Sequence, residues 1–316
     1  SLKTYTVRFC MDLKGSRVLV TGGAGFIGSH LTRRLIDEDA EILVIDNLFV
    51  GKEEFIPEGV KFKKIDIRSK EIGNIIKEFK PDIIIHLAAL HFVPYCNAHP
   101  DETFDVNVMG TRNLLKWCNK LRPHPLIFFA SSAAVYPPLE GPLAENMTDL
   151  GDPIDIYGKG KLIGEEIVRL YFPNSIIGRI FNVYGPNDTN PHLIPEIIRQ
   201  LQEGKRTVRL GNTTPKRDYI HVNDVCEAII TLIKHGKGGI FNIGTGIEHS
   251  VKEVIKITSE VLGEEIQIVQ DEKKVRKVDR EHLVADISKI RNEVGWKPKI
   301  RLKEGIKELI EPAIKV

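Results

Sequence analysis

A glycine-rich stretch near the N-terminus constrains the fold of this chain more than any other feature. It runs Thr21-Gly-Gly-Ala-Gly-Phe-Ile-Gly28, directly after the apolar run Arg17–Val20 and directly before an amphipathic helical pattern. Gly22, Gly25 and Gly28 have the spacing at which a strand turns tightly into a helix and a pyrophosphate can approach the backbone. The first N–H groups of that helix then face the phosphates. The stretch therefore predicts a dinucleotide-binding turn.

A carboxylate follows at the place where such a turn requires one. Asp46 ends the second apolar run, Glu41–Ile45, and lies 18 residues after Gly28, close to the spacing of about 20 expected for an acid that binds ribose. A carboxylate there accepts a hydrogen bond from the 2′-hydroxyl and repels a 2′-phosphate, so the predicted cofactor is NAD and not NADP. The alternative is a tight strand–helix turn without a ligand, in which Asp46 is an ordinary loop residue.

Short apolar runs that alternate with amphipathic stretches predict the rest of the fold. The expected strands are Arg17–Val20, Glu41–Ile45, Lys61–Ile65, Ile83–His86, Leu126–Ala130 and Ser175–Arg179. Apolar strands separated by helices indicate an α/β fold, in which a doubly wound parallel sheet is covered by helices on both faces. Such a fold binds its ligands beyond the carboxyl ends of the strands.

The rhythm breaks after residue 178, which indicates a second, smaller substrate-binding domain. We expect residues 12–178 to form the Rossmann domain that binds NAD, rejoined by about residues 216–245, where a further helix and strand are predicted. The smaller domain then comprises residues 179–215 and 246–316, and residues 1–11 are an N-terminal extension with Met11 as the expected natural start.

Composition argues against several classes of protein. Among its 316 residues, 42% are hydrophobic and 28% charged, and the formal net charge is +2, so neither a nucleic acid nor a membrane is expected as a partner. No run approaches the roughly 18 apolar residues of a membrane span, and the N-terminus has no apolar signal core. The four cysteines lack CxxC spacing, as expected of reduced thiols. We therefore expect a cytoplasmic protein.

Three residues form a candidate catalytic set. Ser132 follows the strand Leu126–Ala130, at the edge of the sheet where chemistry is expected. Tyr157 and Lys161 are four residues apart, which places them on one face of a helix. A lysine ammonium beside a phenol, with a nicotinamide cation near, favours the phenolate and lowers its pKa from about 10. Tyr157 is thus the predicted general base, although the spacing alone also fits a surface pair.

These residues belong to a longer series of motifs along the chain. They are Asp46-Asn47-Leu48, Asp66-Ile67, His86–Ala89, Asn107 with Gly110-Thr111, Ser131–Tyr136, Tyr157–Lys161, Arg179–Pro186, Arg217–Asp224, and Asp286 with Gly295-Trp296 and Pro298. With the glycine-rich turn, this pattern resembles the extended short-chain dehydrogenases/reductases, in the branch of NAD-dependent nucleotide-sugar epimerases and dehydratases. The resemblance spans most of residues 14–312.

The resemblance implies which residues bind the ligands, and it implies a homodimer. The implied cofactor residues are Gly22, Gly25, Phe26, Ile27, Gly28, Asp46, Asn47, Asp66, Ile67, Leu87, Ala88, Ala89, His91, Asn107, Tyr157 and Lys161. The implied residues for a nucleotide-diphosphate sugar are Ser132, Asn182, Leu193, Arg217, Arg276 and Leu283. The arginines suit the diphosphate because a guanidinium binds phosphate in a bidentate manner.

Two alanines bear on the reaction. By the same resemblance, enzymes that eliminate water or decarboxylate need an extra acid just after the active-site serine, but Ala133 and Ala134 stand here. Methyl groups cannot protonate a leaving hydroxyl. We therefore expect NAD-dependent epimerisation of a nucleotide-diphosphate hexose at C4 through a transient 4-keto sugar, with UDP-glucose and UDP-galactose or the N-acetyl pair as substrates. The alternatives are a related reductase, dehydratase or epimerase at another carbon, and a non-catalytic dinucleotide sensor.

Two further expectations concern the pocket. By resemblance, Leu283 occupies the position that gates the 2-substituent of the sugar, and its intermediate bulk predicts that plain and N-acetylated hexoses are both accepted. His91, Cys96 and His99 have a spacing that could suggest zinc. Tetrahedral zinc needs three or four fixed ligands and a second shell. No fourth ligand is evident, so no metal is predicted.

Overall fold

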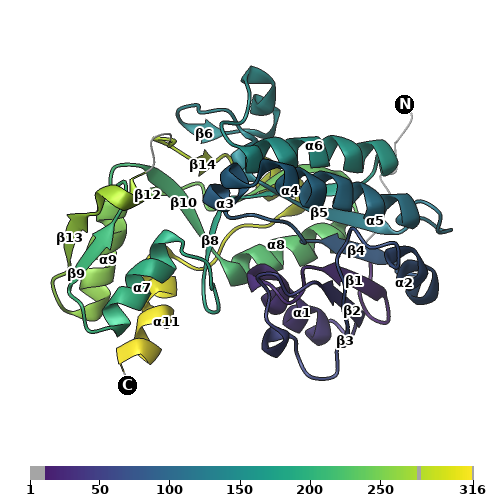
Figure 1. The fold of residues 1–316 in the computed structure, drawn as a ribbon, viewed down its shortest axis with the longest axis horizontal. Helices are drawn as coiled ribbons and strands as arrows, with labels where there is room; N and C mark the ends of the chain where they lie inside the picture. The colour runs from purple at the N-terminus through teal and green to yellow at the C-terminus, as the bar shows by residue number, and fades with distance from the viewer. Residues whose placement is uncertain (1–10, 276–278, 315–316) are drawn as a thin grey trace, which may run out of the picture.

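A seven-stranded sheet forms the centre of the computed structural model (Figure 1). The structure describes residues 11–275 and 279–314. The strand order is β11-β7-β5-β4-β1-β2-β3, and all neighbours pair in parallel. The strands are β1 (Arg17–Thr21), β2 (Glu41–Asp46), β3 (Lys61–Lys64), β4 (Ile83–His86), β5 (Leu126–Ser132), β7 (Ile176–Ile180) and β11 (Gly239–Ile243). The predicted doubly wound parallel sheet is thus confirmed.

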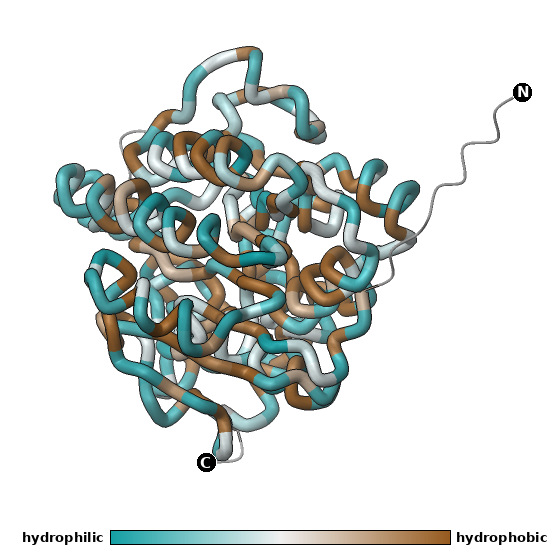
Figure 2. Tube along the Cα trace, turned by 90° about the vertical axis from the view of Figure 1, so that its right-hand side faces the viewer, coloured by the Kyte–Doolittle hydropathy of each residue, from teal (hydrophilic) through white to brown (hydrophobic). Residues whose placement is uncertain are grey.

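Helices cover both faces of this sheet. Its strands send alternate side chains to opposite faces, so Val18 and Val20 of β1 join one core and Leu19 joins the other. The first core includes α1 (Phe26–Asp37), α8 (Val222–His235) and α10 (Ser288–Val294). The second includes α2 (Ile72–Phe79), α5 (Thr111–Cys118) and α6 (Ile156–Tyr171). Figure 2 shows hydrophobic and hydrophilic residues following one another along the chain trace.

A smaller lobe lies to the left of the sheet in Figure 1 and has its own hydrophobic core. Its helices are α7 (Leu193–Gln202), α9 (Val251–Leu262) and α11 (Leu302–Ile314), and α9 and α11 pack together. Its strands are β8 (Asn182–Tyr184), β9 (Thr207–Leu210), β10 (Lys216–His221), β12 (Glu248–Ser250) and β13 (Gln267–Gln270). Most of these strands are too short to show a clear alternating pattern.

Several short elements complete the fold. They are η1 (Glu53–Phe55), α3 (Val93–Ala98), α4 (Pro100–Phe104), η2 (Asp105–Gly110), η3 (Ala133–Val135), β6 (Pro142–Leu143), η4 (Glu145–Leu150), η5 (Glu272–Lys274) and β14 (Val284–Ala285). The pairing of β14 with β6 is parallel and brings the C-terminal part of the chain beside the segment that follows β5. The helical segment between α4 and β5 begins as the π-helical turn η2 and continues as α5.

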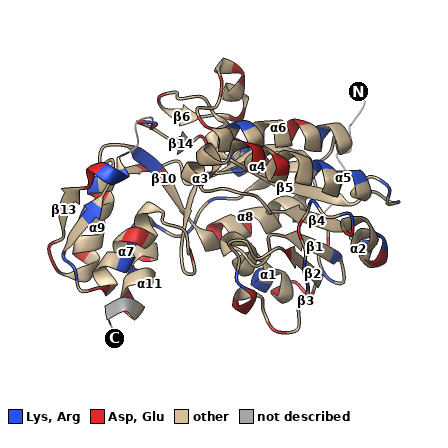
Figure 3. Cartoon of the chain, viewed as in Figure 1, with Lys and Arg blue, Asp and Glu red and all other residues tan. Residues whose placement is uncertain are grey.

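Charges of both signs are interspersed over both lobes (Figure 3). Among the helices of the described residues, none is both long and apolar enough to cross a membrane.

Candidate active site

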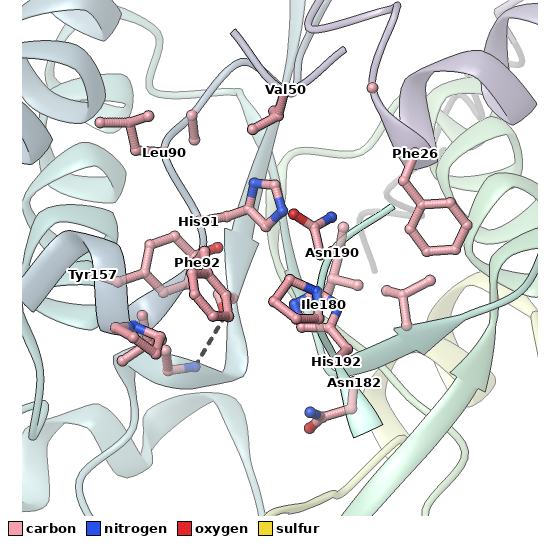
Figure 4. Close-up of a pocket in the computed structure, with 18 of the residues that line it drawn as sticks. Phe26, Val50, Leu90, His91, Phe92, Tyr157, Ile180, Asn182, Asn190 and His192 are labelled. Carbon is pink, nitrogen blue, oxygen red and sulfur yellow. Dashed lines mark hydrogen bonds between the residues drawn. The ribbon is translucent and has the colours of Figure 1, made fainter. Parts of the chain in front are cut away.

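A cavity of about 1300 Å³ lies where the carboxyl ends of the sheet strands meet the smaller lobe. It brings together all the predicted cofactor and substrate residues except Asn107, which does not line it, and Arg276, which lies outside the described residues. Figure 4 shows His91 and Tyr157 from the larger lobe and Asn182 and His192 from the segments after β7 converging on this space.

The glycine-rich turn forms one wall of the cavity, and its glycines are needed for close approach. Gly22 has a φ of +73°, and a Cβ there would lie 2.8 Å from the backbone nitrogen of Ala88. A Cβ on Gly28 would lie 2.2 Å from the carbonyl oxygen of Gly22. Gly25 is the N-cap of α1 and has no side chain to cap the helix. The first amides of α1 therefore face the cavity, ready for an anion.

Asp46 lies at the end of β2, beside this turn. Its carboxylate accepts hydrogen bonds from the backbone N–H groups of Ala24, at 3.1 Å, and Leu48, at 2.8 Å. Burial raises its pKa, and these two hydrogen bonds oppose that effect. Further along the same wall, Asn47 donates to Asp66 at 2.9 Å. The carboxylate is therefore held in place and faces the cavity, as a ribose-binding acid must.

Asn107 supports the cavity from behind. Its amide oxygen accepts from the N–H of Leu90, and its amide nitrogen donates to the carbonyl of the same residue, each at 2.8 Å. Asn107 lies in the π-helical turn η2 and is 3% exposed. Because Leu90 and His91 line the cavity, the side chain of Asn107 acts on the site through the backbone it holds.

The candidate catalytic residues lie together at the end of β5 and the start of α6. Asp155 caps α6 by accepting from the N–H of Gly158 at 2.7 Å. A Cβ on Gly158 would lie 2.2 Å from the carbonyl oxygen of Ala134. This glycine weakens the helix, but it lets the segment after Ser132 pack directly against the turn that carries Tyr157.

The electrostatics of this pair differ from the expectation for Tyr157. Burial raises the pKa of Tyr157, and the neighbouring Ser132 hydroxyl opposes that effect. Lys161 is buried and donates from Nζ to the carbonyl oxygen of Ala130 at 2.7 Å, while Nζ lies 5.9 Å from the centre of the Tyr157 ring. Burial lowers the pKa of Lys161 to about 8. Burial of the phenol therefore acts in the direction opposite to the expected effect of the ammonium and the nicotinamide cation.

Arg217 projects from β10 into the opposite wall of the cavity. One guanidinium nitrogen donates to Asp279 at 2.5 Å, and the other donates to the carbonyl oxygen of Arg280 at 2.8 Å. The side chain is only 14% exposed. A diphosphate that binds Arg217 must therefore displace the carboxylate of Asp279 from the guanidinium or bind the guanidinium together with it.

Arg280, which no sequence motif singled out, also lines the cavity. This residue is 5% exposed and donates to the carbonyl oxygens of Ala134, Tyr136 and Pro137 at 3.0, 2.5 and 3.2 Å. It thereby ties the segment after Ser132 to the chain around Asp279. The one sequence signal that pointed to Arg280 was its position beside a predicted diphosphate-binding segment. Its contacts are with backbone carbonyls, which every residue type carries, so they require no recognisable sequence motif.

Two of the three candidate zinc ligands, Cys96 and His99, lie in different surroundings. Cys96 is buried, whereas His99 stacks on Tyr95 with ring centres 4.1 Å apart. Within the described residues, no group of three or more His, Cys, Asp or Glu side chains could hold a metal ion.

Comparison with known sequences identifies relatives along nearly the whole chain. The family model for GDP-mannose 4,6 dehydratase matches residues 19–309. A UDP-glucose 4-epimerase of Lactobacillus helveticus is 34% identical, over 90% of this chain and 92% of its own. UDP-glucuronic acid decarboxylase 1 of Arabidopsis thaliana is 32% identical, over 98% of this chain and 72% of its own. The relatives thus share one family but catalyse different reactions.

Solved structures give the same result. UDP-glucose 4-epimerase of Thermotoga maritima, solved with UDP-glucose, has a TM-score of 0.87 at 30% identity and covers 95% of this chain and 99% of its own. The Thermus thermophilus enzyme of the same name, in complex with NAD, has a TM-score of 0.85 at 32% identity and covers 94% and 99%. The chain belongs to the extended short-chain dehydrogenase/reductase family of nucleotide-sugar epimerases and dehydratases.

Proposed function

We propose that this protein epimerises a nucleotide-diphosphate hexose at C4, with NAD as cofactor and a transient 4-keto sugar as intermediate. One observation carries the proposal: Ser132, Tyr157 and Lys161 line the same cavity as the uncapped start of α1 and the carboxylate of Asp46. The names of the epimerase relatives support the same reaction.

The residues of the first wall fit NAD. The close backbone packing at Gly22 and Gly28 leaves room for a pyrophosphate, the amides of α1 can bind it, and Asp46 can accept from the 2′-hydroxyl of the ribose. When bound, the nicotinamide supplies a hydride acceptor and donor. Asp66, Ile67, Leu87, Ala88, Ala89 and His91 line the remainder of this wall.

The opposite wall fits the nucleotide sugar. Arg217 and the start of α7 at Leu193 can hold the diphosphate, and Asn182 lines the same cavity. Leu283 belongs to the same small core as Ala133 and Phe181 and also lines the cavity, which suits its proposed role as gate for the 2-substituent. The relatives named for UDP-sugars favour uridine as the base.

Tyr157 accepts the proton of the C4 hydroxyl as the sugar is oxidised, and returns it when the keto group is reduced from the other face. Ser132 donates a hydrogen bond to the same oxygen and keeps it near the phenol. The Lys161 ammonium favours the phenolate that this step requires. The same three groups serve both half-reactions, so no further acid is needed.

The Arabidopsis relative is a decarboxylase, so decarboxylation and dehydration are the competing activities. Ala133 is 2% exposed, and Ala134 follows it in η3 with no acidic group. Neither can donate a proton to a leaving group. A dinucleotide sensor without activity is disfavoured because Tyr157 and Lys161 both line the cavity.

We also propose the division into two domains and the homodimer. The hydrophobic core of the smaller lobe is separate from the two cores of the sheet, which supports the division. Met109 on η2 and Ile163 and Leu170 on α6 are 50%, 42% and 79% exposed. Exposed apolar residues on neighbouring helices suit an interface between two copies.

The test is turnover of UDP-galactose and of UDP-N-acetylgalactosamine by the purified protein, with products separated by chromatography. We expect the C4 epimers to form without net accumulation of NADH, and NAD to bind more tightly than NADP. Stoichiometric NADH would indicate a dehydrogenase, release of carbon dioxide from UDP-glucuronic acid would indicate a decarboxylase, and tighter NADP binding would contradict the role of Asp46.

A further inference from the structure

A buried ion pair lies directly behind the catalytic residues. Arg179 of β7 donates from Nε to Oε1 of Glu165 at 2.9 Å and from a terminal nitrogen to Oε2 at 2.7 Å. The two side chains are 2% and 1% exposed. Glu165 Oε1 also accepts from the hydroxyl of Ser131 at 2.5 Å. The carboxylate is thus held by three hydrogen bonds, none of which the proposed reaction uses.

Stability alone does not explain this pair. Burying two charges is costly, and well-packed apolar residues of similar volume often stabilise a fold equally well or better. The position of the pair suggests another role. Ser131 directly precedes Ser132 in β5, and Glu165 follows Lys161 by four residues on α6. Glu165 is therefore linked to Ser132 through Ser131 and to Lys161 through one turn of the helix.

The charges around Lys161 make Glu165 distinctive. Lys161 interacts electrostatically with several titratable groups: Tyr157 and Glu165 on α6, His86 on β4, His91 after β4, and Cys96 on α3. Burial lowers the pKa of His86 to about 3 and also lowers that of His91, while it raises those of Cys96 and Tyr157. Burial therefore favours the neutral form of those four groups. Glu165, held by Arg179, supplies the negative charge.

We propose that Glu165 is a positioning residue for the reaction: it fixes the end of β5 that carries Ser132 and keeps Lys161 in its ammonium form. The inference rests on the proposed function, in which that ammonium favours the Tyr157 phenolate. Glu165 acts through its neighbours, since its carboxylate is occupied by Ser131 and Arg179.

The test is the pH profile of kcat in the holoenzyme. Burial lowers the pKa of Lys161 to about 8, and Glu165 opposes that shift. Glu165→Gln removes the opposing charge, so the pKa falls further and activity is lost at lower pH. Lys161 and Glu165 lie about one helical turn apart on α6. In a medium of effective dielectric about 20, the basic limb should therefore move down by about 1 to 2 pH units. A purely structural role would lower the whole profile without moving the limb.

Two further variants control for folding and geometry. Glu165→Gln alone leaves Arg179 buried without its partner, so the double variant Glu165→Gln/Arg179→Met removes both charges and should fold. It should still show the shifted limb. Ser131→Ala keeps the carboxylate and should lower kcat without moving the limb, and Glu165→Asp should restore the limb to its wild-type position. An unshifted limb in the folded double variant overturns the proposal.

The same shift can be measured without turnover. NMR titration of the Lys161 side chain, assigned by the signal lost in Lys161→Met, should show a lower pKa in the double variant than in wild type. If the wild-type protein epimerises no nucleotide sugar, the proposed function fails alone. If Lys161 titrates identically in both proteins, the inference about Glu165 fails alone.

Discussion

The two walls of the cavity are built in different ways. On the proposed cofactor side, the turn at residues 21–28 and Asp46 lie close together in sequence, and the start of α1 has no side-chain cap on its backbone amides. On the substrate side, Asn182, Leu193, Arg217 and Leu283 come from segments spread over about 100 residues. Their side chains are held by ion pairs and small cores, such as Arg217 with Asp279.

This difference indicates how each wall responds to change. A backbone site depends on close packing, so even one added carbon atom in the turn disturbs it. A side-chain site depends on competing partners: Arg217 already has a carboxylate within 2.5 Å, so its charge is partly compensated before any phosphate arrives. Substitutions should therefore affect NAD and nucleotide-sugar binding separately.

The largest effect is expected where the two walls meet. Tyr157→Phe removes the proton acceptor and should lower kcat by about 10²- to 10⁴-fold, the usual contribution of general acid–base catalysis. Steady-state kinetics measures the loss. NAD and UDP should both still bind, as measured by calorimetry, because the turn at residues 21–28, Asp46 and Arg217 are unaltered. Full activity in this variant would mean that Tyr157 is not the base.

Arg217→Met tests the substrate wall. A hydrogen bond to a charged group contributes about 1.5–3 kcal/mol, so KM for the nucleotide sugar should rise by roughly 10- to 100-fold, with NAD affinity unchanged. Asp279→Asn is the matched control: it keeps the side-chain shape but removes the competing charge, and it should not weaken binding to the same extent. An equal loss of NAD affinity in Arg217→Met would show that the walls are not independent.

Gly28→Ala tests the cofactor wall. The new Cβ would lie 2.2 Å from the Gly22 carbonyl oxygen, and such overpacking costs about 1–3 kcal/mol. We expect NAD affinity to fall by up to about 100-fold while UDP affinity is retained. Gly160→Ala is the control, because its Cβ would meet nothing closer than 3.8 Å. Unchanged NAD affinity in Gly28→Ala would rule out the close approach proposed for this turn.

The smallest effect is expected at the sugar gate. Leu283 is 8% exposed and borders the cavity, so Leu283→Tyr adds volume where little is free. The kcat/KM for the N-acetylated sugar relative to the plain hexose should fall by about 10-fold. Measurement of both sugars in wild type and variant gives this ratio. An unchanged ratio would assign Leu283 to the small core around Ala133 alone.

The central sheet and the glycine-rich turn could be predicted because their signals are local. The apolar runs that became β1, β2, β4 and β5 are continuous and buried, and the turn chemistry follows directly from the spacing of its glycines. The smaller lobe gave weaker signals. In β9 every second residue is exposed, and β13 has no buried residue, so neither carries a continuous apolar run.

The parallel α/β sheet, the glycine-rich turn and the Tyr157–Lys161 pair could all be inferred from residue order, because each depends on spacing within a few residues or one helix. The contacts of Arg280 with the segment after Ser132, and the pairing of Glu165 with Arg179, emerged from the folded chain alone. It also showed that burial raises the pKa of Tyr157. The reason is physical: desolvation and contacts to backbone carbonyls depend on which distant segments pack together, and no local residue pattern encodes them.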